Sequence, residues 1–158
     1  MDIKYLERAV NLAKTALDKG EEPFGSILVS HDGKILFEGY NEVSSGDHTR
    51  HPEFEIAKWA VNNLTLEERS KTTVYTSGEH CPMCAAAHGW VGLGRIVYAA
   101  SAQQLASWMK EFGAKPSRVN PIPIQEVIRN TEVIGPFKEF EETLKNYQYE
   151  AYKMRKKL

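Results

Sequence analysis

The 158-residue chain has only two cysteines, contains no long apolar run and shows no excess of either charge. Two thiols cannot form the several disulfides that hold small secreted scaffolds together. No segment approaches the roughly 20 consecutive apolar residues of a membrane-spanning helix, and scattered charges within residues 1–20 exclude the apolar core of a signal peptide. Twenty Lys and Arg stand against 21 Asp and Glu, which is not the basic excess of a nucleic-acid-binding protein. These absences predict a cytoplasmic protein with no membrane partner, and they weigh against a nucleic-acid partner.

What the chain does contain is the composition of an ordinary globular domain. Hydrophobic residues make up 42% and charged residues 26%, so residues 1–158 are expected to form a single domain. Apolar periodicity and turn residues predict helices over 3–17, 52–64, 82–91, 102–112 and 137–154, strands over 25–31, 34–38, 71–76, 95–100 and 132–135, and loops over 41–50 and 116–123. This order predicts an α/β fold, a three-layer α/β/α sandwich with a central mixed five-stranded sheet.

Two short motifs each place metal-binding side chains at the predicted start of a helix. His51-Pro52-Glu53 opens the helix over 52–64, and Cys81-Pro82-Met83-Cys84 opens the helix over 82–91. Proline suits the first helical turn, and the partial positive charge there favours the thiolate that binds metal. Three ligands leave the fourth position of a tetrahedral zinc ion open, which is typical of catalytic sites. The sequence therefore predicts one Zn²⁺ per chain, held by His51, Cys81 and Cys84.

Glu53 lies two residues after the predicted histidine ligand, on the first turn of the helix. A carboxylate at this position would be close to a zinc-bound water without binding the metal, and it could relay protons. A redox pair formed by Cys81 and Cys84 is the alternative interpretation of Cys-x-x-Cys. That alternative leaves His51 and Glu53 without a role, so the metal interpretation is preferred.

The combination of His-x-Glu and a later Cys-x-x-Cys resembles the zinc deaminases of the cytidine deaminase superfamily. Further segments follow the family's order over most of the chain: Pro23-Phe24-Gly25, Gly39-Tyr40-Asn41, Tyr75-Thr76-Ser77, Trp90 and Val97-Tyr98-Ala99-Ala100. Bacterial guanine deaminases are the most similar members, with tRNA adenosine and cytosine deaminases more distant. The resemblance implies a cytidine deaminase-like fold and hydrolysis at a cyclic amidine: water on zinc attacks the ring carbon, Glu53 moves the protons and ammonia leaves.

The resemblance also implies roles around the metal. Asn41 resembles the loop asparagine that hydrogen-bonds the base, and Phe24 and Trp90 resemble the aromatic walls of the pocket. His80 stands where the family usually has proline, which makes it a candidate substrate contact, a group behind the ligands or a neutral replacement. Such enzymes are usually homodimers or larger homo-oligomers, in which a neighbouring subunit completes each pocket.

The resemblance implies a small-molecule heterocycle as substrate, with a guanine-like purine as the best match. Pterins and triazines are further candidates, because the chain has no aspartate after Asp47 and ends in Leu158, whereas guanine deaminases use a later aspartate and a terminal tyrosine. Glu111 is a candidate replacement for the aspartate. The candidate replacements for the tyrosine are Tyr147, Tyr149 and Tyr152.

Two other functions are kept as alternatives. The first is a tRNA-specific adenosine deaminase, for which the basic cluster formed by Lys153, Arg155, Lys156 and Lys157 would contact phosphate. Cations at a helix C-terminus also complement the helix dipole, and this simpler explanation is preferred. The second is a non-catalytic zinc module, which predicts that Glu53→Gln changes nothing measurable.

Overall fold

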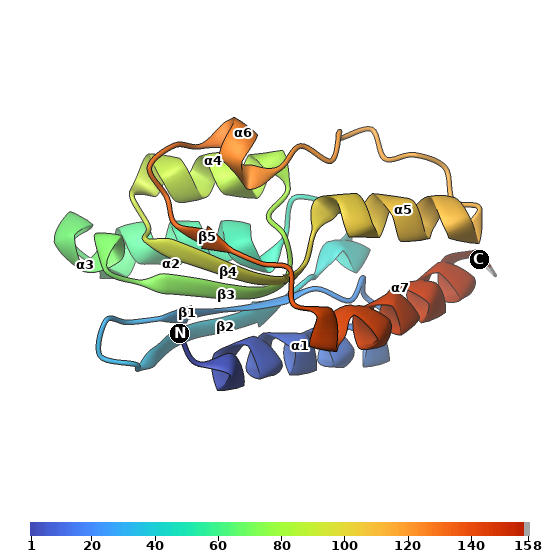
Figure 1. The fold of residues 1–158 in the computed structure, drawn as a ribbon, viewed down its shortest axis with the longest axis horizontal. Helices are drawn as coiled ribbons and strands as arrows, with labels where there is room; N and C mark the ends of the chain where they lie inside the picture. The colour runs from blue at the N-terminus through green and yellow to red at the C-terminus, as the bar shows by residue number, and fades with distance from the viewer. Residues whose placement is uncertain (157–158) are drawn as a thin grey trace.

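The structure, a computed structural model, describes residues 1–156 and is built around one five-stranded sheet (Figure 1). The strands are β1 (Gly25–Val29), β2 (Ile35–Tyr40), β3 (Thr73–Gly78), β4 (Arg95–Ala100) and β5 (Val133–Ile134), in the spatial order β2-β1-β3-β4-β5. β1 pairs antiparallel with β2 and with β3, whereas β3, β4 and β5 run parallel. The predicted mixed sheet is therefore confirmed, with a hairpin joining β1 to β2 and helical crossovers joining the parallel strands.

Helices cover both faces of this sheet. In the described part of the chain they are α1 (Ile3–Asp18), α2 (Pro52–Asn63), α3 (Leu66–Ser70), α4 (Pro82–Val91), α5 (Ala102–Phe112), α6 (Ile124–Val127) and α7 (Glu141–Lys156), with the 3₁₀ helices η1 (Val43–Ser45) and η2 (Lys138–Phe140). Figure 1 shows α1 and α7 on one side of the sheet and α2 and α4 on the other. This arrangement is the predicted three-layer α/β/α sandwich.

Strand β1, between β2 and β3, separates two halves of the core. Its Ile27 and Val29 pack with residues of α1 and α7, while Leu28 packs with α2. All five residues of β1 are buried, as expected for a strand covered on both faces. Gly25 lets α1 lie directly against the strand, because a Cβ there would come within 2.4 Å of the Ala9 carbonyl oxygen.

Several local details differ from the sequence-based expectations. The third strand ends at Gly78, two residues later than predicted, because its pairing with β4 continues to Ala100. The short helices α3 and α6 were not predicted, since four or five residues are too few for apolar periodicity to appear. Helix α3 is instead held by a capping box, in which Thr65 and Glu68 bond each other's backbone N–H groups.

Two cations near the end of the C-terminal helix have carboxylate partners. Lys153 pairs with Glu150 of the same helix at 2.9 Å, and Arg155 ties the helix to the body of the protein by pairing with Glu22 at 2.7 Å. Lys157 lies outside the described residues. The cations at 153 and 155 thus have partners within the chain, which supports the structural explanation of the basic cluster over a phosphate contact. Within residues 1–156, none of the helices combines the length and apolar character needed to cross a bilayer.

Candidate active site

The two sequence motifs meet where helices α2 and α4 begin, beside the carboxyl end of β3. His51 is the N-cap residue of α2 and Cys81 is the N-cap residue of α4, and proline follows each of them at the first helical position. The α2 and α4 helices lie side by side on the same face of the sheet. Packing of these two helices therefore brings together residues that are 30 positions apart in the sequence.

Three donor atoms form a compact triangle at this point. The Sγ atoms of Cys81 and Cys84 are 3.4 Å apart, and each lies 3.5 Å from Nδ1 of His51. These separations match one face of a tetrahedron with Zn–S and Zn–N distances of about 2.3 and 2.0 Å, for which edges of roughly 3.5–3.8 Å are expected. The three residues fit a zinc ion in size and in donor chemistry, and the described residues add no fourth ligand to the group.

The contacts within the triangle determine which thiol ionises first. The hydrogen bond from the Cys84 thiol lowers the pKa of Cys81 to about 4, and the contact with His51 contributes in the same direction. The same thiol contact, together with burial, raises the pKa of Cys84. The contact with Cys81 raises the pKa of His51, with smaller contributions from the negative charges of Glu53 and Glu22. The cluster therefore holds one thiolate even before a metal supplies its own positive charge.

Glu53 is a buried carboxylate held by two hydroxyl groups. The Thr76 hydroxyl lies 2.8 Å and the Ser26 hydroxyl 3.1 Å from Oε1 of Glu53, and the two hydroxyls are 2.8 Å from each other. Both of these side-chain contacts end on Oε1, and the backbone N–H of Glu53 itself also bonds to the carboxylate. The carboxylate is therefore anchored through Oε1 beside the metal-binding residues.

Burial is the main influence on the protonation of this carboxylate. It raises the pKa of Glu53, while the hydrogen bond from Thr76 and the charge of His51 act in the opposite direction. A carboxylate with a raised pKa is a better proton carrier near neutral pH than an exposed one. The environment of Glu53 thus suits a group that both accepts and returns a proton.

The loops that carry Phe24 and Asn41 border the same region. The backbone N–H of Asn41 donates to the Phe24 carbonyl at 3.0 Å, and the Asn41 side chain is buried. The Phe24 ring packs over Gly78 at the end of β3, where a Cβ would come within 3.1 Å of the ring. Both residues therefore lie at the same end of the sheet as Glu53 and the metal-binding residues.

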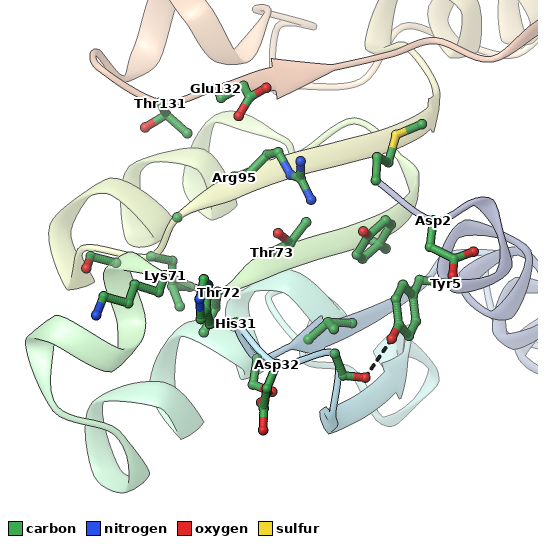
Figure 2. A pocket seen from close by; sticks show the side chains of 18 of the residues that line it. Asp2, Tyr5, His31, Asp32, Lys71, Thr72, Thr73, Arg95, Thr131 and Glu132 are labelled. Atoms are coloured by element: carbon green, nitrogen blue, oxygen red, sulfur yellow. Dashed lines mark hydrogen bonds between the residues drawn. The ribbon is translucent and has the colours of Figure 1, made fainter.

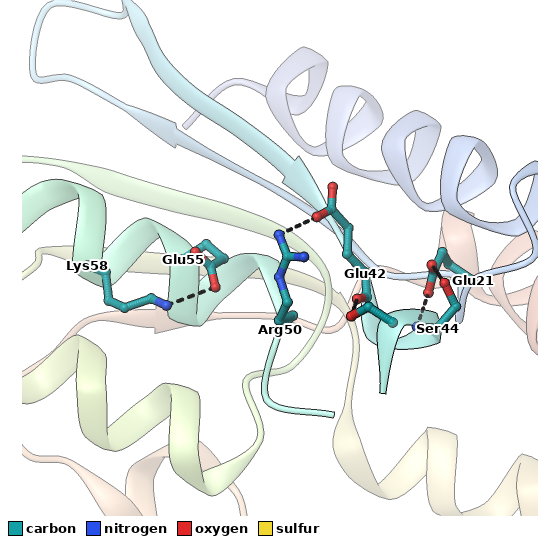
Figure 3. Close-up of polar contacts among 7 residues, drawn as sticks. Glu21, Glu42, Ser44, Arg50, Glu55 and Lys58 are labelled. Carbon is teal, nitrogen blue, oxygen red and sulfur yellow. Dashed lines mark hydrogen bonds and ion pairs between the residues drawn. The ribbon is translucent and has the colours of Figure 1, made fainter. Parts of the chain in front are cut away.

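The loop over 41–51 is fastened on both sides of η1. Figure 3 shows Arg50 paired with Glu42, at 2.6 Å, and Glu21 accepting hydrogen bonds from Ser44. The first contact closes the loop on itself, and the second ties it to the segment that follows α1. These contacts restrict the path of the chain between Asn41 and His51.

Neither Trp90 nor His80 is placed to contact a substrate within this chain: Trp90 is remote from the metal-binding residues, and His80, which precedes Cys81, is buried. Trp90 is 90% exposed on the outer surface of α4, about 13 Å along the helix from the N-cap at Cys81, so it does not line the site of its own chain. His80 is 1% exposed and packs edge-on against His88, with ring centroids 5.4 Å apart. Neither ring nitrogen of His80 has a hydrogen-bond partner within residues 1–156. A substrate cannot contact this side chain without a rearrangement.

The candidate replacements for the missing aspartate and tyrosine also face away. Glu111 is an exposed residue of α5 that pairs with Lys145 of α7 at 2.8 Å. Tyr149 and Tyr152 pack against Phe112, with ring centroids 5.0 and 6.0 Å apart. These side chains join α5 to α7, so the α5–α7 contact explains them without a role in the site.

Three supporting residues were not predicted from the sequence. Ser26 and Thr76 are polar residues within buried strands, and the β1–β3 register places them directly opposite each other. Glu79 accepts hydrogen bonds from the backbone of Ala102 and Ile124, both at 2.9 Å, and so joins the starts of α5 and α6 next to the cysteine motif. A hydroxyl in an otherwise apolar strand was the available signal for the first two, because buried polar groups need a partner.

A surface groove of about 890 Å³ lies at the opposite end of the sheet (Figure 2). It is lined by residues around the starts of β3 and β4, among them Thr73, Arg95 and Glu132, and by the turn at Asp32. None of the predicted site residues lines this groove. Its size therefore does not identify it as the site of the chemistry.

The fold and the donor triangle define an α/β protein with a zinc site of the catalytic type. Residues 1–100 match the model of the cytidine and deoxycytidylate deaminase zinc-binding region. The chain belongs to this family, and it is a zinc-dependent hydrolytic deaminase.

Individual relatives cover nearly the whole chain. A probable cytosine deaminase of Schizosaccharomyces pombe is 33% identical over 89% of this chain and 86% of its own length. The guanine deaminase of Bacillus subtilis is 35% identical over 84% of this chain and 89% of its own length. The solved guanine deaminase of Nitrosomonas europaea superimposes with a TM-score of 0.70 at 16% identity, covering 96% of this chain and 84% of that one. At that identity the superposition supports the fold alone.

Proposed function

We propose that the protein deaminates a free nucleobase or nucleoside, or a related amino-substituted heterocycle, with a guanine-like purine as the leading candidate. The observation that carries the proposal is the position of Glu53, a buried carboxylate anchored at Oε1 by two hydroxyl groups beside three metal-binding side chains. We place the reaction in the cytoplasm, where a reducing environment keeps Cys81 and Cys84 available as ligands.

In this proposal His51, Cys81 and Cys84 hold one zinc ion, which when bound lowers the pKa of a water molecule. Glu53 would accept a proton from the attacking water and give it to a ring nitrogen, which makes the ring carbon easier to attack, while Ser26 and Thr76 keep Oε1 in place. After the attack, Glu53 would take the second proton from the oxygen now bonded to that carbon and pass it to the amino group, which leaves as ammonia while the carbonyl forms. Asn41 and Phe24 orient the ring.

A small ring is a better candidate than tRNA for three reasons. Two relatives that match over most of the chain are named for cytosine and guanine. The formal net charge is −1, and a protein that binds tRNA needs a broad basic surface. The cations of the C-terminal helix at 153 and 155 are paired with carboxylates. Pterins and triazines belong in the test because no side chain in the described site distinguishes one ring from another.

We further propose that the protein forms a homodimer through the surface between α2 and α4. This groove, of about 420 Å³, is lined mostly by apolar side chains, including Phe54, Val61, Ala87 and Trp90. An exposed tryptophan over an apolar groove is typical of a protein–protein interface. A second copy offers the same surface in reverse, so a two-fold axis covers both tryptophans at once. Such a dimer would also place each Trp90 beside the start of its partner's helices.

The dimer is tested by light scattering after gel filtration. Trp90→Lys is expected to convert the dimer to a monomer, because it puts a charge into the centre of the interface. Leu66→Lys is the matched control, since Leu66 is also exposed and apolar but does not line the groove. A monomeric wild-type protein, or equal effects of both changes, would contradict this interface.

The proposed function is tested by ammonia release from a panel of aminated purines, pyrimidines, pterins and triazines. Zinc-loaded wild type and Glu53→Gln are compared, with zinc content measured for both. Deamination of one ring class by the wild type and a loss of at least about 10³-fold in the variant would support the proposal. A wild type that holds zinc but deaminates no ring would overturn it and direct attention to tRNA or to a non-catalytic role.

A further inference from the structure

Two consecutive glutamates link the segment after α1 to the loop that carries Asn41. Glu21 accepts hydrogen bonds from the backbone and side chain of Ser44. Glu22 uses its two oxygens differently: Oε2 lies 3.4 Å from Nδ2 of Asn41, and Oε1 lies 2.7 Å from the guanidinium of Arg155. Glu22 therefore connects the predicted base-binding asparagine to the last turn of α7.

The carboxylate of Glu22 determines which end of the Asn41 amide faces it. An ionised carboxylate only accepts hydrogen bonds, whereas an amide has one donating and one accepting end. The amide nitrogen of Asn41 must therefore face Glu22, and its carbonyl oxygen must point elsewhere. Arg155 holds the Glu22 carboxylate in place through its 2.7 Å contact, and Gln148 donates to the adjacent Pro23 carbonyl at 3.4 Å.

The carbonyl oxygen of Asn41 is the end of the amide that stays open to a ligand. The amide nitrogen faces Glu22, and no hydrogen bond from a residue among 1–156 to the amide oxygen is seen. An acceptor of this kind can receive an N–H group from a bound ring. Asn41 lies next to Phe24, and the neighbouring strand residue Ser26 contacts Glu53, so a ring bound near Glu53 is well placed to supply the donor.

We propose that Glu22 is a positioning residue that orients the Asn41 amide so that its carbonyl oxygen receives an N–H group of the substrate. This inference rests on the deaminase function proposed above and narrows the substrate class to rings with an N–H at that position. It also gives the C-terminal helix a role in specificity, through the Arg155–Glu22–Asn41 chain of contacts. Neither Glu22 nor Arg155 reacts with the substrate.

An exchange of donor and acceptor tests this arrangement. Asn41→Asp places the new carboxylate next to that of Glu22, and their repulsion disfavours the native arrangement of the two side chains. KM is therefore expected to rise at least about ten-fold, with a smaller effect on kcat. Adding Glu22→Gln restores a donor on one side and an acceptor on the other, and the carboxylate introduced at position 41 still offers an oxygen to the ring. The double variant should therefore recover a KM within about three-fold of the wild-type value. Glu21→Gln is the matched control, because Glu21 binds the same loop without contacting Asn41, and it should not rescue Asn41→Asp.

The outcomes separate this inference from the proposed function. Rescue by Glu22→Gln but not by Glu21→Gln supports the inference. An active wild type with no rescue overturns the inference alone, because an aspartate cannot replace an asparagine that donates its N–H to the substrate. A zinc-loaded wild type that deaminates no ring overturns the proposed function, and the inference falls with it.

A second measurement applies if Asn41→Asp does not fold. In Glu22→Gln alone, the glutamine can present either end to Asn41, so the amide loses its fixed orientation. The ratio of kcat/KM between an active ring and its N-methylated analogues is then expected to fall at least about ten-fold from the wild-type ratio, because a site that hydrogen-bonds an N–H strongly rejects analogues without it. An unchanged ratio overturns the inference.

Discussion

The two ends of the central sheet differ in the kind of polar group that they bury. At the end that holds the metal-binding triangle, the Glu53 carboxylate is buried, and the hydroxyls of Ser26 and Thr76 both contact it. At the other end Thr72 is buried as well, but the charged side chains of both signs border an open groove (Figure 2). Burying a charged group costs far more than burying a hydroxyl. A fold that retains a buried carboxylate therefore marks the region where that group is used, and groove size alone is a poor guide.

The largest effect is expected from loss of a metal-binding residue. Cys84→Ala removes a buried thiol from the triangle and leaves two donors, too few to hold zinc at a catalytic site. Zinc content should fall well below one ion per chain, and ammonia release should drop by more than about 10³-fold. Zinc analysis and turnover are measured together, and a chelator applied to the wild type should reproduce the loss. Met83→Leu, between the two cysteines, is the control and should retain zinc.

The second prediction compares two threonines of the same strand, one near each end of the sheet. Thr76→Val removes the hydroxyl 2.8 Å from Glu53 while keeping nearly the same volume. The carboxylate then loses an anchor, so kcat should fall about 10- to 100-fold with little change in KM, by analogy with other groups that hold a proton carrier in place. Thr73→Val makes the same chemical change beside the groove and should alter kcat less than about two-fold. Equal losses in both variants would contradict the contrast between the two ends.

The parts of this site that could be predicted from the sequence are local. His51, Glu53, Cys81 and Cys84 fall within two motifs of three and four residues, and each motif begins a helix whose start is marked by proline. Short-range spacing determines the relative positions of the residues within each motif, whereas the meeting of the two motifs depends on the packing of α2 against α4. The order of helices and strands followed from periodicity for the same reason.

The parts that could not be predicted depend on contacts between distant segments. Ser26 meets Thr76 only through the register of β1 against β3, and Glu22 meets Arg155 across 133 positions. Whether Trp90 faces the site or the solvent depends on how α4 rotates against α2 and the sheet. The resemblance placed Trp90 in the pocket, but a matching residue on a helix surface can serve a neighbouring chain instead of its own.

The third prediction concerns two buried histidines near the metal-binding end, His80 and His88. Unlike the buried Glu53, they include ring nitrogens that have no hydrogen-bond partner within residues 1–156. Burial lowers the pKa of His88 to about 4 from an ordinary value near 6.5, and it also lowers the pKa of His80. Between pH 6.5 and 4 the unfolded chain binds more protons than the folded one, so the folded state loses stability as the pH falls. From pH 7 to pH 5, His88 should account for about 2 kcal/mol of lost unfolding free energy.

Urea unfolding of the zinc-loaded wild type and of His88→Gln measures this contribution. Glutamine can still donate to the Gly94 carbonyl, which the His88 Nε2 contacts at 2.7 Å, and it does not titrate. The pH dependence of zinc binding is common to both proteins and cancels in the comparison. Identical slopes between pH 7 and 5 would mean that His88 binds protons equally in the folded and unfolded chains, which contradicts a pKa lowered by burial.

The smallest effect is expected at the far end of the sheet, where Arg95 borders the groove. It forms no ion pair within residues 1–156, and its buried Nε has no hydrogen-bond partner there. Arg95→Gln should therefore change kcat/KM less than about two-fold and the unfolding free energy by at most about 1 kcal/mol. Parallel measurements on Thr76→Val give the scale for comparison. A loss of activity in Arg95→Gln as large as in Thr76→Val would mean that the start of β4 influences the chemistry at its other end. Burial of polar groups would then no longer distinguish the end of the sheet where the reaction takes place.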